Sequence, residues 1–454
     1  MTGDETINPA VVSSSRSGEP WTIAAIATAA GPGGVGIVRL SGPRAIAIAS
    51  ELLGVAANEL GREVRLGWAR DLGGTRVDQV LAFAMRAPAS FTGEDVAELH
   101  GHGGVHNLGK LLAAVVERGA RIAEPGEFTR RAVEHGKLDL LRAEALLEVI
   151  QAGSERAWRL AQTNLAGRLG TEVAELETRA LGVLAELEGS IDFPEEDLET
   201  KAATWLDAEI GALRSRCAQL ASGFRHGQAV SRGISVALVG PVNVGKSSLM
   251  NALVGSERAL VAPDPGTTRD WIEVTDVWHG IAVTVIDTAG LRATDDPIER
   301  RGIALGEQRV EAADVVVVVN DGSSPWNDGA RYRERAVVVL SKSDLGSDPR
   351  AALPTSAATG QGLEALRRRV LEVAGVADHE GSEHPVVTTA RQQALASTAR
   401  DAFTAAAEGL TARRPLEVIA VELREASQAL ARLRGVEVGD RVLDEVFARF
   451  CIGK

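Results

Sequence analysis

Cysteine is almost absent from this chain of 454 residues. The two that it has, Cys217 and Cys451, lie far apart and form no metal-binding or disulfide pattern, which excludes a small secreted domain held together by disulfides. Long apolar runs are missing too, since no segment approaches the roughly 20 apolar residues that span a bilayer. We therefore expect a cytoplasmic protein without a membrane anchor.

Positive charge is also scarce, because 49 Lys and Arg against 62 Asp and Glu give a formal net charge of -13. This balance excludes a general electrostatic affinity for nucleic acid, which needs clustered cations to neutralise phosphates. Any RNA-directed role must be local or shared with a partner. The basic run at residues 367–369 lies on a predicted helix, where a solvated face is favoured over an RNA site.

Residues 1–20 are rich in Ser, Gly and Pro and lack the continuous apolar core of a signal peptide. They are expected to form a disordered tail. The remaining length predicts two to four domains with ample core.

Residues 234–251 stand out, because an unbroken β-branched run stops at a glycine-rich turn and restarts as a helix. Residues 234–239 are typical of a buried parallel strand, and the next eight, GPVNVGKS, fit the pattern GxxxxGK[ST] at every fixed position. Its glycines let backbone N–H groups close on the β-phosphate, Lys246 reaches the β and γ oxygens, and Ser247 ligates Mg²⁺. The stretch therefore predicts a P-loop.

Three later stretches indicate that the nucleotide is GTP. Thr268, in GTTRD, offers a second hydroxyl for Mg²⁺ that is ordered only while a γ-phosphate is present. Asp287, in DTAG, holds Mg²⁺ through water, and the Gly290 N–H senses the γ-phosphate. Asp344, in SKSD, can accept from N1–H and the 2-amino group of guanine, an edge that adenine lacks. Four motifs in this order on predicted strand ends indicate a GTPase.

Residues 21–135 predict a small α+β domain, because short β-branched runs alternate with glycine turns. The segments SFTGED and ELHGHGG within it are denser in polar and glycine residues than packing alone requires. A metal site at His100, His102 and His106 is an open alternative, although their spacing matches no known site.

Helical patterns flank the GTPase region on both sides. The leading part, 136–232, holds long stretches rich in Ala, Leu and Glu with a break at 191–197, and the trailing part, 375–454, holds three more. An insertion at a surface turn costs little when its ends are close together. We therefore expect one all-α domain formed by both flanks, with an α/β GTPase domain at 233–374 inserted into it.

Together these segments resemble the MnmE (TrmE) family, the GTPases of wobble-uridine modification in tRNA. The resemblance covers nearly the whole chain and is carried by GGVGIVRLSG, SFTGEDVAELHGHGG, PGEFTRRA, GKLDL, IDFPEED, the GTPase motifs and the terminal FCIGK. It implies a folate-binding, dimerising N-terminal domain, a helical domain and a Ras-like P-loop GTPase domain. It also implies a homodimer and a heterotetramer with MnmG (GidA), which carries FAD and uses NADH.

The product that this resemblance implies is a carboxymethylaminomethyl or aminomethyl group at carbon 5 of the wobble uridine of certain tRNAs. It is built with glycine or ammonium and a one-carbon unit from a reduced folate, either 5,10-methylene- or 5-formyl-tetrahydrofolate.

The family's folate contacts fall on Arg39, Glu98, Lys137 and Lys454. Glu98 can accept from a pterin edge, and Arg39 or a lysine can pair with the glutamate tail. The alternative for each residue alone is an ordinary surface charge. The resemblance places Cys451 near this chemistry as a candidate nucleophile, although a chain-terminal thiol is usually inert.

The family's nucleotide and metal positions are more numerous. The implied nucleotide contacts are Asn243, Val244, Gly245, Lys246, Ser247, Ser248, Thr267, Thr268, Asp287, Thr288, Ala289, Gly290, Ser341, Lys342, Asp344, Ser356 and Ala357. The implied Mg²⁺ ligands are Ser247 and Thr268, and the implied K⁺ ligands are Asn243, Ala262, Asp264 and Thr267. In this family K⁺ replaces an arginine finger. The loop that surrounds K⁺ is completed only when two GTPase domains meet, so hydrolysis should require dimerisation.

Three positions depart from common patterns. Leu291 occupies the place of the Gln that orients the attacking water in many small GTPases, a role that the family gives to a glutamate matched by Glu299. Surface exposure is the alternative for Glu299. Ser341 replaces the usual Asn, which bonds the N7 side of guanine and tethers the P-loop, and GPVN replaces GRPN. Ser341 is therefore expected to lower nucleotide affinity without changing base preference.

Two other functions compete with this interpretation. A regulatory or ribosome-assembly GTPase, which only switches partners, explains residues 233–373 equally well but leaves the N-terminal domain and FCIGK unexplained. A folate-binding module with a relic GTPase is disfavoured, because both Mg²⁺ hydroxyls and Asp287 are present.

Overall fold

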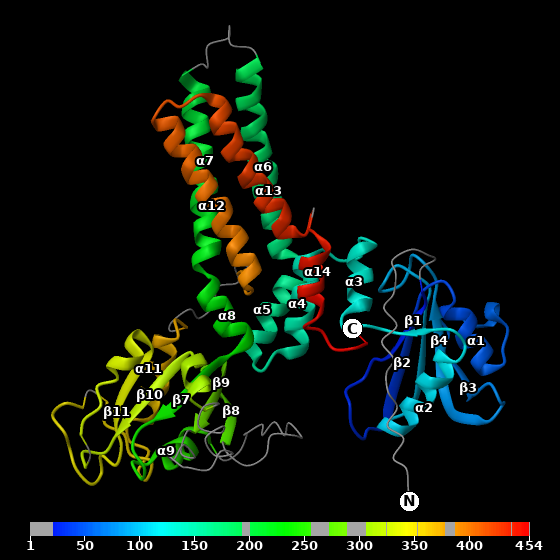
Figure 1. Cartoon of the computed structure of the whole chain (residues 1–454), viewed down its shortest axis with the longest axis horizontal. Helices are drawn as coiled ribbons and strands as arrows, with labels where there is room; N and C mark the ends of the chain where they lie inside the picture. Colours follow the sequence, from blue (N-terminus) through cyan, green and yellow to red (C-terminus); the bar gives the residue numbers. More distant parts are fainter. Residues whose placement is uncertain are drawn as a thin grey trace, which may run out of the picture. The chain divides into compact units, whose positions relative to one another are not determined.

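The computed structural model describes residues 21–192, 200–255, 272–287, 306–323, 325–351, 353–376, 386–436 and 438–453. The chain divides into two compact units (Figure 1): Met1–Leu138 with Gly439–Lys454, and Asp139–Val438. No helix in the described ranges combines the length and the apolarity that crossing a membrane requires.

The first unit is built on a six-stranded sheet in the order β3-β4-β5-β2-β1-β6. Neighbouring strands are antiparallel, except that β1 and β6 are parallel. The strands are β1 (Ile23–Ile26), β2 (Val35–Ser41), β3 (Arg65–Arg70), β4 (Arg76–Met85), β5 (Val96–His102) and β6 (Arg121–Ile122). The helices are α1 (Ala45–Leu53), η1 (Ala57–Glu59), α2 (Val105–Val116), α3 (Glu127–Glu134) and α14 (Asp440–Phe447). The predicted α+β class is confirmed.

The two faces of this sheet differ, because successive side chains of a strand point to opposite sides. Helices α1 and α2 cover one face and share an apolar core with it that includes Leu40 and Leu99. The other face, here called the open face, is covered only in part. Phe128 of α3 packs with β1, whereas Leu66 and Leu81 on β3 and β4 are 62% and 46% exposed.

Residues Gly439–Lys454 group with the first unit, apart from the rest of the predicted segment 375–454, whose assignment to the helical domain stays a prediction. Gly126 lets this segment approach, since a Cβ there would lie 2.6 Å from the carbonyl oxygen of Phe447. Pro125 and Ile452 then form an isolated antiparallel bridge. Spacing cannot reveal this contact, because its partners are more than 300 residues apart.

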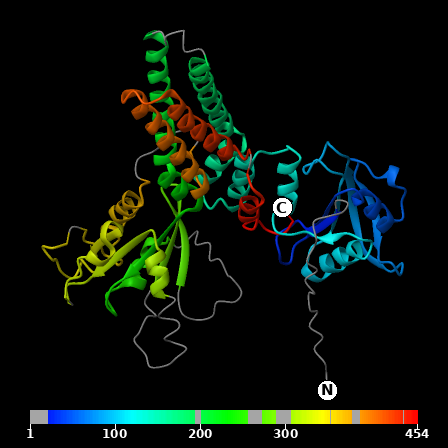
Figure 2. The same ribbon diagram turned by 45° about the horizontal axis from the view of Figure 1, so that its top comes forward.

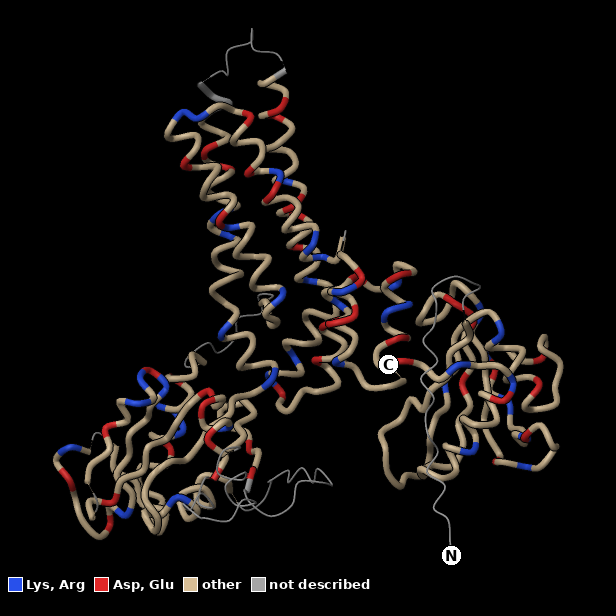
Figure 3. The backbone as a smooth tube through the Cα atoms, in the orientation of Figure 1, with Lys and Arg blue, Asp and Glu red and all other residues tan. Residues whose placement is uncertain are grey.

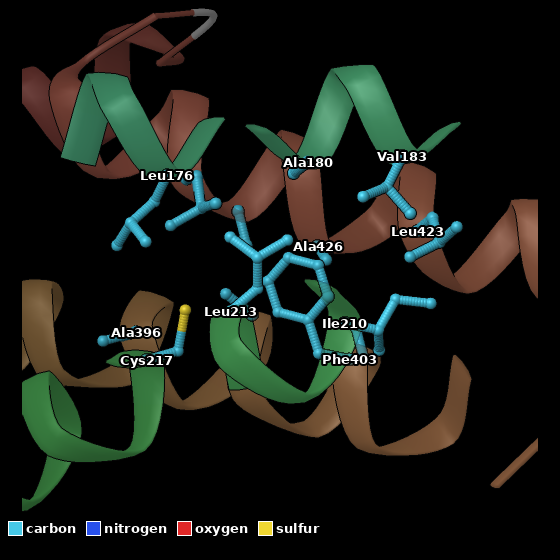
Figure 4. Packing of buried hydrophobic residues seen from close by; sticks show 14 of the residues in the cluster. Leu176, Ala180, Val183, Ile210, Leu213, Cys217, Ala396, Phe403, Leu423 and Ala426 are labelled. Carbon is cyan, nitrogen blue, oxygen red and sulfur yellow. The ribbon is translucent and has the colours of Figure 1, made fainter. Parts of the chain in front are cut away.

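The second unit contains a bundle of four long helices that run side by side in both views (Figure 1 and Figure 2). They are α6 (Arg168–Asp192), α7 (Thr200–Ser222), α12 (Ala390–Thr411) and α13 (Leu416–Arg434). Side chains from all four converge in the core, with the fully buried Phe403 among them (Figure 4). Cys217 lies in the same core, where burial raises the pKa of its thiol to about 12.

A five-stranded sheet in the order β11-β10-β7-β9-β8 forms the rest of this unit. Only β8 runs antiparallel to its neighbour. The strands are β7 (Ile234–Val239), β8 (Ile272–Trp278), β9 (Ile281–Asp287), β10 (Val315–Asn320) and β11 (Ala336–Leu340). Helices α9 (Lys246–Leu253) and α11 (Leu363–Val373) share a core with it, a 3-10 helix, η2, spans Ala330–Arg335, and residues 306–312 are also helical. The predicted Ras-like α/β fold is confirmed.

The sheet domain is inserted between helices of the bundle, as expected. Before it come α4 (Leu140–Gln151), α5 (Glu155–Leu165), α6, α7 and α8 (Phe224–Arg232), and after α11 come α12 and α13. The bundle is thus built from both flanks of the insertion.

Candidate functional site

The P-loop is the turn between β7 and α9, and its backbone requires the two glycines that the pattern specifies and suits the Asn between them. Gly240, Asn243 and Gly245 have φ values of 153°, 63° and 103°. Residues other than Gly and Asn rarely adopt such positive φ values. A Cβ on Gly240 would lie 2.4 Å from the carbonyl oxygen of Val319 in β10. The loop therefore closes tightly onto the strand ends and leads directly into the N-terminus of α9, a position that favours anions.

Lys246 is held across the mouth of this loop. Its Nζ donates to the carbonyl oxygens of Gly240 and Pro241, both at 2.9 Å, and the residue is 6% exposed. Burial lowers the pKa of this ammonium, and the nearby Asp287 carboxylate offsets part of that effect. Phosphate oxygens can take the place of these carbonyl acceptors, so the loop is shaped for a polyphosphate.

Two of the predicted magnesium groups meet beside the loop. The Ser247 hydroxyl at the start of α9 donates to Oδ2 of Asp287, which ends β9, at 2.5 Å. Two oxygen donors beside a phosphate site suit Mg²⁺, which prefers hard oxygen ligands and shares them with phosphates. The remaining coordination positions would fall to phosphate, water and the predicted Thr268.

The guanine motif is tied to the P-loop by two side chains. Ser341 Oγ lies 2.5 Å from the carbonyl oxygen of Val244, and Lys342 Nζ donates to that of Asn243 at 2.7 Å. Lys342 also pairs with Asp321 at 3.1 Å. Asp344 is exposed, and within the described part of the chain its carboxylate has no hydrogen-bond partner, which leaves it free to accept from a base.

The other nucleotide positions contribute less polar contact. Val244 is buried in the core, and Ser248 is exposed in the first turn of α9. Ser356 is fully buried, and its hydroxyl accepts from the backbone N–H of Thr359 at 3.2 Å. Ala357 is half-buried beside it.

Several predicted residues lie outside the described ranges, and their roles stay predictions. They are Ala262, Asp264, Thr267, Thr268, Thr288, Ala289, Gly290, Glu299 and Lys454.

The sheet register of the first unit brings Arg39 and Glu98 together. They are direct partners on β2 and β5, and Arg39 Nε donates to Glu98 Oε1 at 2.8 Å. His100 Nε2 lies 2.8 Å from the other carboxylate oxygen. Burial alone would raise the pKa of Glu98, but the His100 hydrogen bond and the Arg39 charge hold it below its ordinary value. We call Arg39, Glu98 and His100 the charged triad.

The charged triad lies where the covered and exposed parts of the open face meet. Phe83, opposite Glu98 on β4, packs edge-on against His100 with ring centroids 5.3 Å apart. On its other side, the Arg39 guanidinium lies over the Phe128 ring at 5.9 Å. Sequence reasoning missed Phe83 and assigned His100 only to a metal alternative. The available signal was strand periodicity, which places residues 98 and 100 on one face.

The other predicted folate residues approach the charged triad unequally. The carbonyl oxygen of Gly453, next to Lys454, accepts from Arg39 Nη1 at 3.5 Å, so this end segment reaches the charged triad. The Lys137 contact is instead with the carbonyl oxygen of Pro88, at 3.0 Å. Cys451 has an exposed side chain, while its carbonyl oxygen accepts from the Gly126 N–H at 3.5 Å.

The polar segments SFTGED and ELHGHGG have structural contacts of their own. Ser41 on β2 bonds both Thr92 and Glu94 at 2.7 Å, and Glu94 in turn pairs with Arg131 of α3. His102 Nδ1 lies 2.7 Å from the buried Asp78. In the described ranges, no three His, Cys, Asp or Glu residues are grouped as a metal site would require.

The basic run at 367–369 is largely neutralised by neighbours on α11. Arg367 and Arg368 pair with Glu364, and Arg369 pairs with Glu372. Basic and acidic residues are interspersed along the described backbone as a whole (Figure 3). These pairs agree with a solvated face.

Comparison with known proteins covers almost the entire chain. Residues 140–451 match the family described as the MnmE helical domain, and residues 22–137 match the GTP-binding protein TrmE N-terminus. A tRNA modification GTPase MnmE of Synechococcus sp. (strain JA-3-3Ab) is 40% identical over 95% of this chain and 98% of its own length. Those of Synechococcus sp. (strain CC9605) and Moorella thermoacetica are 42% and 40% identical, each over 95% of this chain and 99% of their own. The chain therefore belongs to the MnmE family of tRNA modification GTPases.

Proposed function

We propose that this GTP-hydrolysing enzyme adds a carboxymethylaminomethyl or aminomethyl group to carbon 5 of the wobble uridine of certain tRNAs, with the carbon supplied by a reduced folate. The observation that carries this proposal is the charged triad, which presents a carboxylate, a guanidinium and an imidazole beside an exposed apolar surface. A folate has the complementary parts: a flat pterin with hydrogen-bond donors and an anionic glutamate tail.

In this proposal Glu98 accepts from the pterin edge, and Arg39 with Lys137 and Lys454 pairs with the anionic tail. When bound, the folate supplies the one-carbon unit. Arg39 and His100 keep Glu98 ionised at neutral pH, so its carboxylate is ready to accept two donors. Cys451, on the segment that reaches Arg39 through Gly453, is the proposed nucleophile.

We propose an FAD-carrying partner, MnmG, that uses NADH, as the resemblance to the MnmE family implies, with the redox chemistry supplied by the partner's cofactor. The two proteins would form a heterotetramer on a homodimer of this chain in the cytoplasm. The exposed apolar residues of the open face, Leu66, Trp68 and Leu81, support such a homodimer, since patches of this kind are typical of protein interfaces.

For GTP hydrolysis we propose Mg²⁺ at Ser247, Asp287 and Thr268, and K⁺ at Asn243 and the loop of Ala262, Asp264 and Thr267, with Glu299 orienting the water. The left-handed backbone of Asn243, fixed by the Lys342 contact to its carbonyl, supports a defined side-chain position there. Asn243→Ala should abolish any rate advantage of K⁺ over Na⁺, and equal wild-type rates in the two salts would refute the K⁺ site.

The proposal as a whole is tested by the nucleosides of tRNA from cells that lack the gene. Modified wobble uridines should disappear and return when the wild-type chain is supplied. They should stay absent with Cys451→Ser, while Cys217→Ser, a change at the buried thiol, should restore them. Unaltered nucleosides in the deletion strain would instead support a purely regulatory GTPase.

A further inference from the structure

The first residue of the guanine motif, Ser341, is enclosed by backbone carbonyls. The residue is 5% exposed, and its Oγ lies 2.5 Å from the oxygen of Val244 and 3.0 Å from that of Asn320. Both neighbours are acceptors, so the hydroxyl must act as the donor in either bond. It ties the P-loop to the ends of β10 and β11.

A hydroxyl carries a single hydrogen. With that hydrogen directed at a carbonyl, Ser341 Oγ presents only lone pairs to any third group. N7 of guanine is itself an acceptor, so it cannot bond to this oxygen. An Asn side chain differs at this point, because its NH₂ group carries two hydrogens and can serve a carbonyl and N7 together.

Two backbone donors and the lysine ammonium of the motif are engaged as well, whereas the buried Ser343 hydroxyl has no hydrogen-bond partner among the described residues. The Ser341 N–H donates to the Asn320 oxygen at 2.7 Å, and the Ser343 N–H donates to the Thr355 oxygen at 3.0 Å. Lys342 Nζ is shared between the Asn243 carbonyl and Asp321. Asp344, by contrast, is exposed and without a partner among the described residues.

We propose that this enzyme is indifferent to N7 of guanine and discriminates the base through its N1–H and 2-amino edge, because the one hydrogen of the Ser341 hydroxyl is directed at backbone carbonyls. Ser341 is then a positioning residue, and Asp344 is the residue that determines specificity. The inference rests on guanine-nucleotide binding at the P-loop, and it is independent of the folate and tRNA proposals.

The test compares GDP with 7-deaza-GDP, in which a C–H group replaces N7 and nothing else changes. Titration calorimetry of the full chain with Mg²⁺ should give dissociation constants that agree within about twofold. A neutral hydrogen bond to N7 would instead weaken the analogue by roughly two- to tenfold. Wild-type protein that binds 7-deaza-GDP more than about twofold more weakly than GDP would overturn the proposal.

Two substitutions at the same position sharpen the result. Ser341→Asn should tighten GDP and create a preference for GDP over 7-deaza-GDP of roughly two- to tenfold. Ser341→Ala removes the tether and should weaken both ligands by the same factor. A selective loss of GDP binding in Ser341→Ala would show that the serine does reach N7. If Ser341→Asn fails to fold, the wild-type comparison still decides.

The base edge provides the positive control. Asp344→Asn should shift preference from GDP to xanthosine diphosphate in the same assay, because an amide can donate to the 2-oxo group that replaces the amine. If GDP does not bind the wild-type chain at all, nucleotide binding itself has failed, and that result is distinct from an unexpected dependence on N7.

Discussion

The two candidate sites are held together in opposite ways. In the nucleotide site, Lys246, Ser341 and Lys342 all donate to backbone carbonyls of the P-loop. In the charged triad, the contacts are instead with a side chain, Glu98. Arg39 reaches it from the neighbouring strand, and His100 reaches it from two residues along the same strand. Backbone carbonyls persist in any variant that folds, whereas a side-chain acceptor is lost with one substitution or one proton. The nucleotide site should thus depend mainly on the fold, and the charged triad on ionisation.

Removal of the P-loop ammonium should have the largest effect. Lys246→Ala eliminates the ammonium held over the Gly240 and Pro241 carbonyls and should lower kcat/KM for GTP on the order of 10³-fold, since its bonds to phosphate oxygens strengthen in the transition state. Phosphate release measures the rate. Asn251→Ala, at an exposed position later in α9, serves as the control and should change kcat/KM less than about twofold. Normal turnover in Lys246→Ala would mean that another cation serves the phosphates.

A buried carboxyl outside both sites provides a reference for the role of ionisation. Burial raises the pKa of Glu148 in α4 from 4.5 to about 7, opposed by a hydrogen bond from Thr388 and reinforced by the charge of Glu144. The folded chain therefore holds this proton more tightly than the unfolded chain. The protonated carboxyl stabilises the folded state fully below about pH 4.5. This contribution declines as pH rises to about 7 and is lost above, which lowers the free energy of unfolding by about 3 kcal/mol.

Glu148→Gln should therefore raise the stability of this region at pH 8 relative to wild type and leave it nearly unchanged at pH 5. Hydrogen exchange of the α4 and α12 amides at the two pH values measures this difference. Glu155→Gln, at an exposed carboxyl in α5, is the control. A wild-type region equally protected at both pH values would mean that Glu148 does not change its protonation between them, which contradicts the raised pKa.

Loss of the central carboxylate should disable the charged triad selectively. Glu98→Gln keeps the shape but leaves the partly buried Arg39 without its ion partner, and it should weaken 5-formyl-tetrahydrofolate about 10- to 30-fold. Equilibrium dialysis measures the binding. Glu134→Gln, at an exposed ion pair on α3, should have no effect. Unchanged folate affinity in Glu98→Gln would separate the charged triad from the folate site.

Acid should destabilise the strands of the charged triad before those of the nucleotide site. Partners hold the pKa of Glu98 and Asp78 below ordinary values, although burial works against them. Groups with lowered pKa stabilise the folded state above their unfolded pKa, and this contribution is lost as pH falls through the folded one. The β5 amides should therefore lose exchange protection before those of β7 and β10 when the pH falls below the ordinary pKa values of Asp and Glu. The reverse order would contradict the proposed dependence of the charged triad on ionisation.

The same contrast explains what the sequence could predict. Strand β7 and the P-loop are contiguous, and Ile234–Val239 matches the predicted strand at both ends. Asp287 and Ser341 follow predicted strands at the same sheet edge, so their proximity to the loop could be anticipated. The Arg39–Glu98 pair depends on strand register over 59 residues, which only the family resemblance supplied. The packing of Phe447 on Gly126 had no local signal, because long-range contacts leave none in either segment.

The bond pattern at Ser341 also goes beyond spacing. The resemblance to the family marks Ser341 as a departure from the usual Asn and predicts weaker nucleotide binding. The structure shows that the tether to Val244 is retained, so the expected loss is confined to the base.

The most direct test of two separate sites in one modification enzyme is the wobble-uridine content of tRNA in deletion cells that carry single variants. Lys246→Ala and Glu98→Gln should both fail to restore the modified nucleoside, although purified Glu98→Gln hydrolyses GTP at the wild-type rate. Restoration of full modification by Glu98→Gln, at wild-type protein levels, would contradict a role for the charged triad in the reaction.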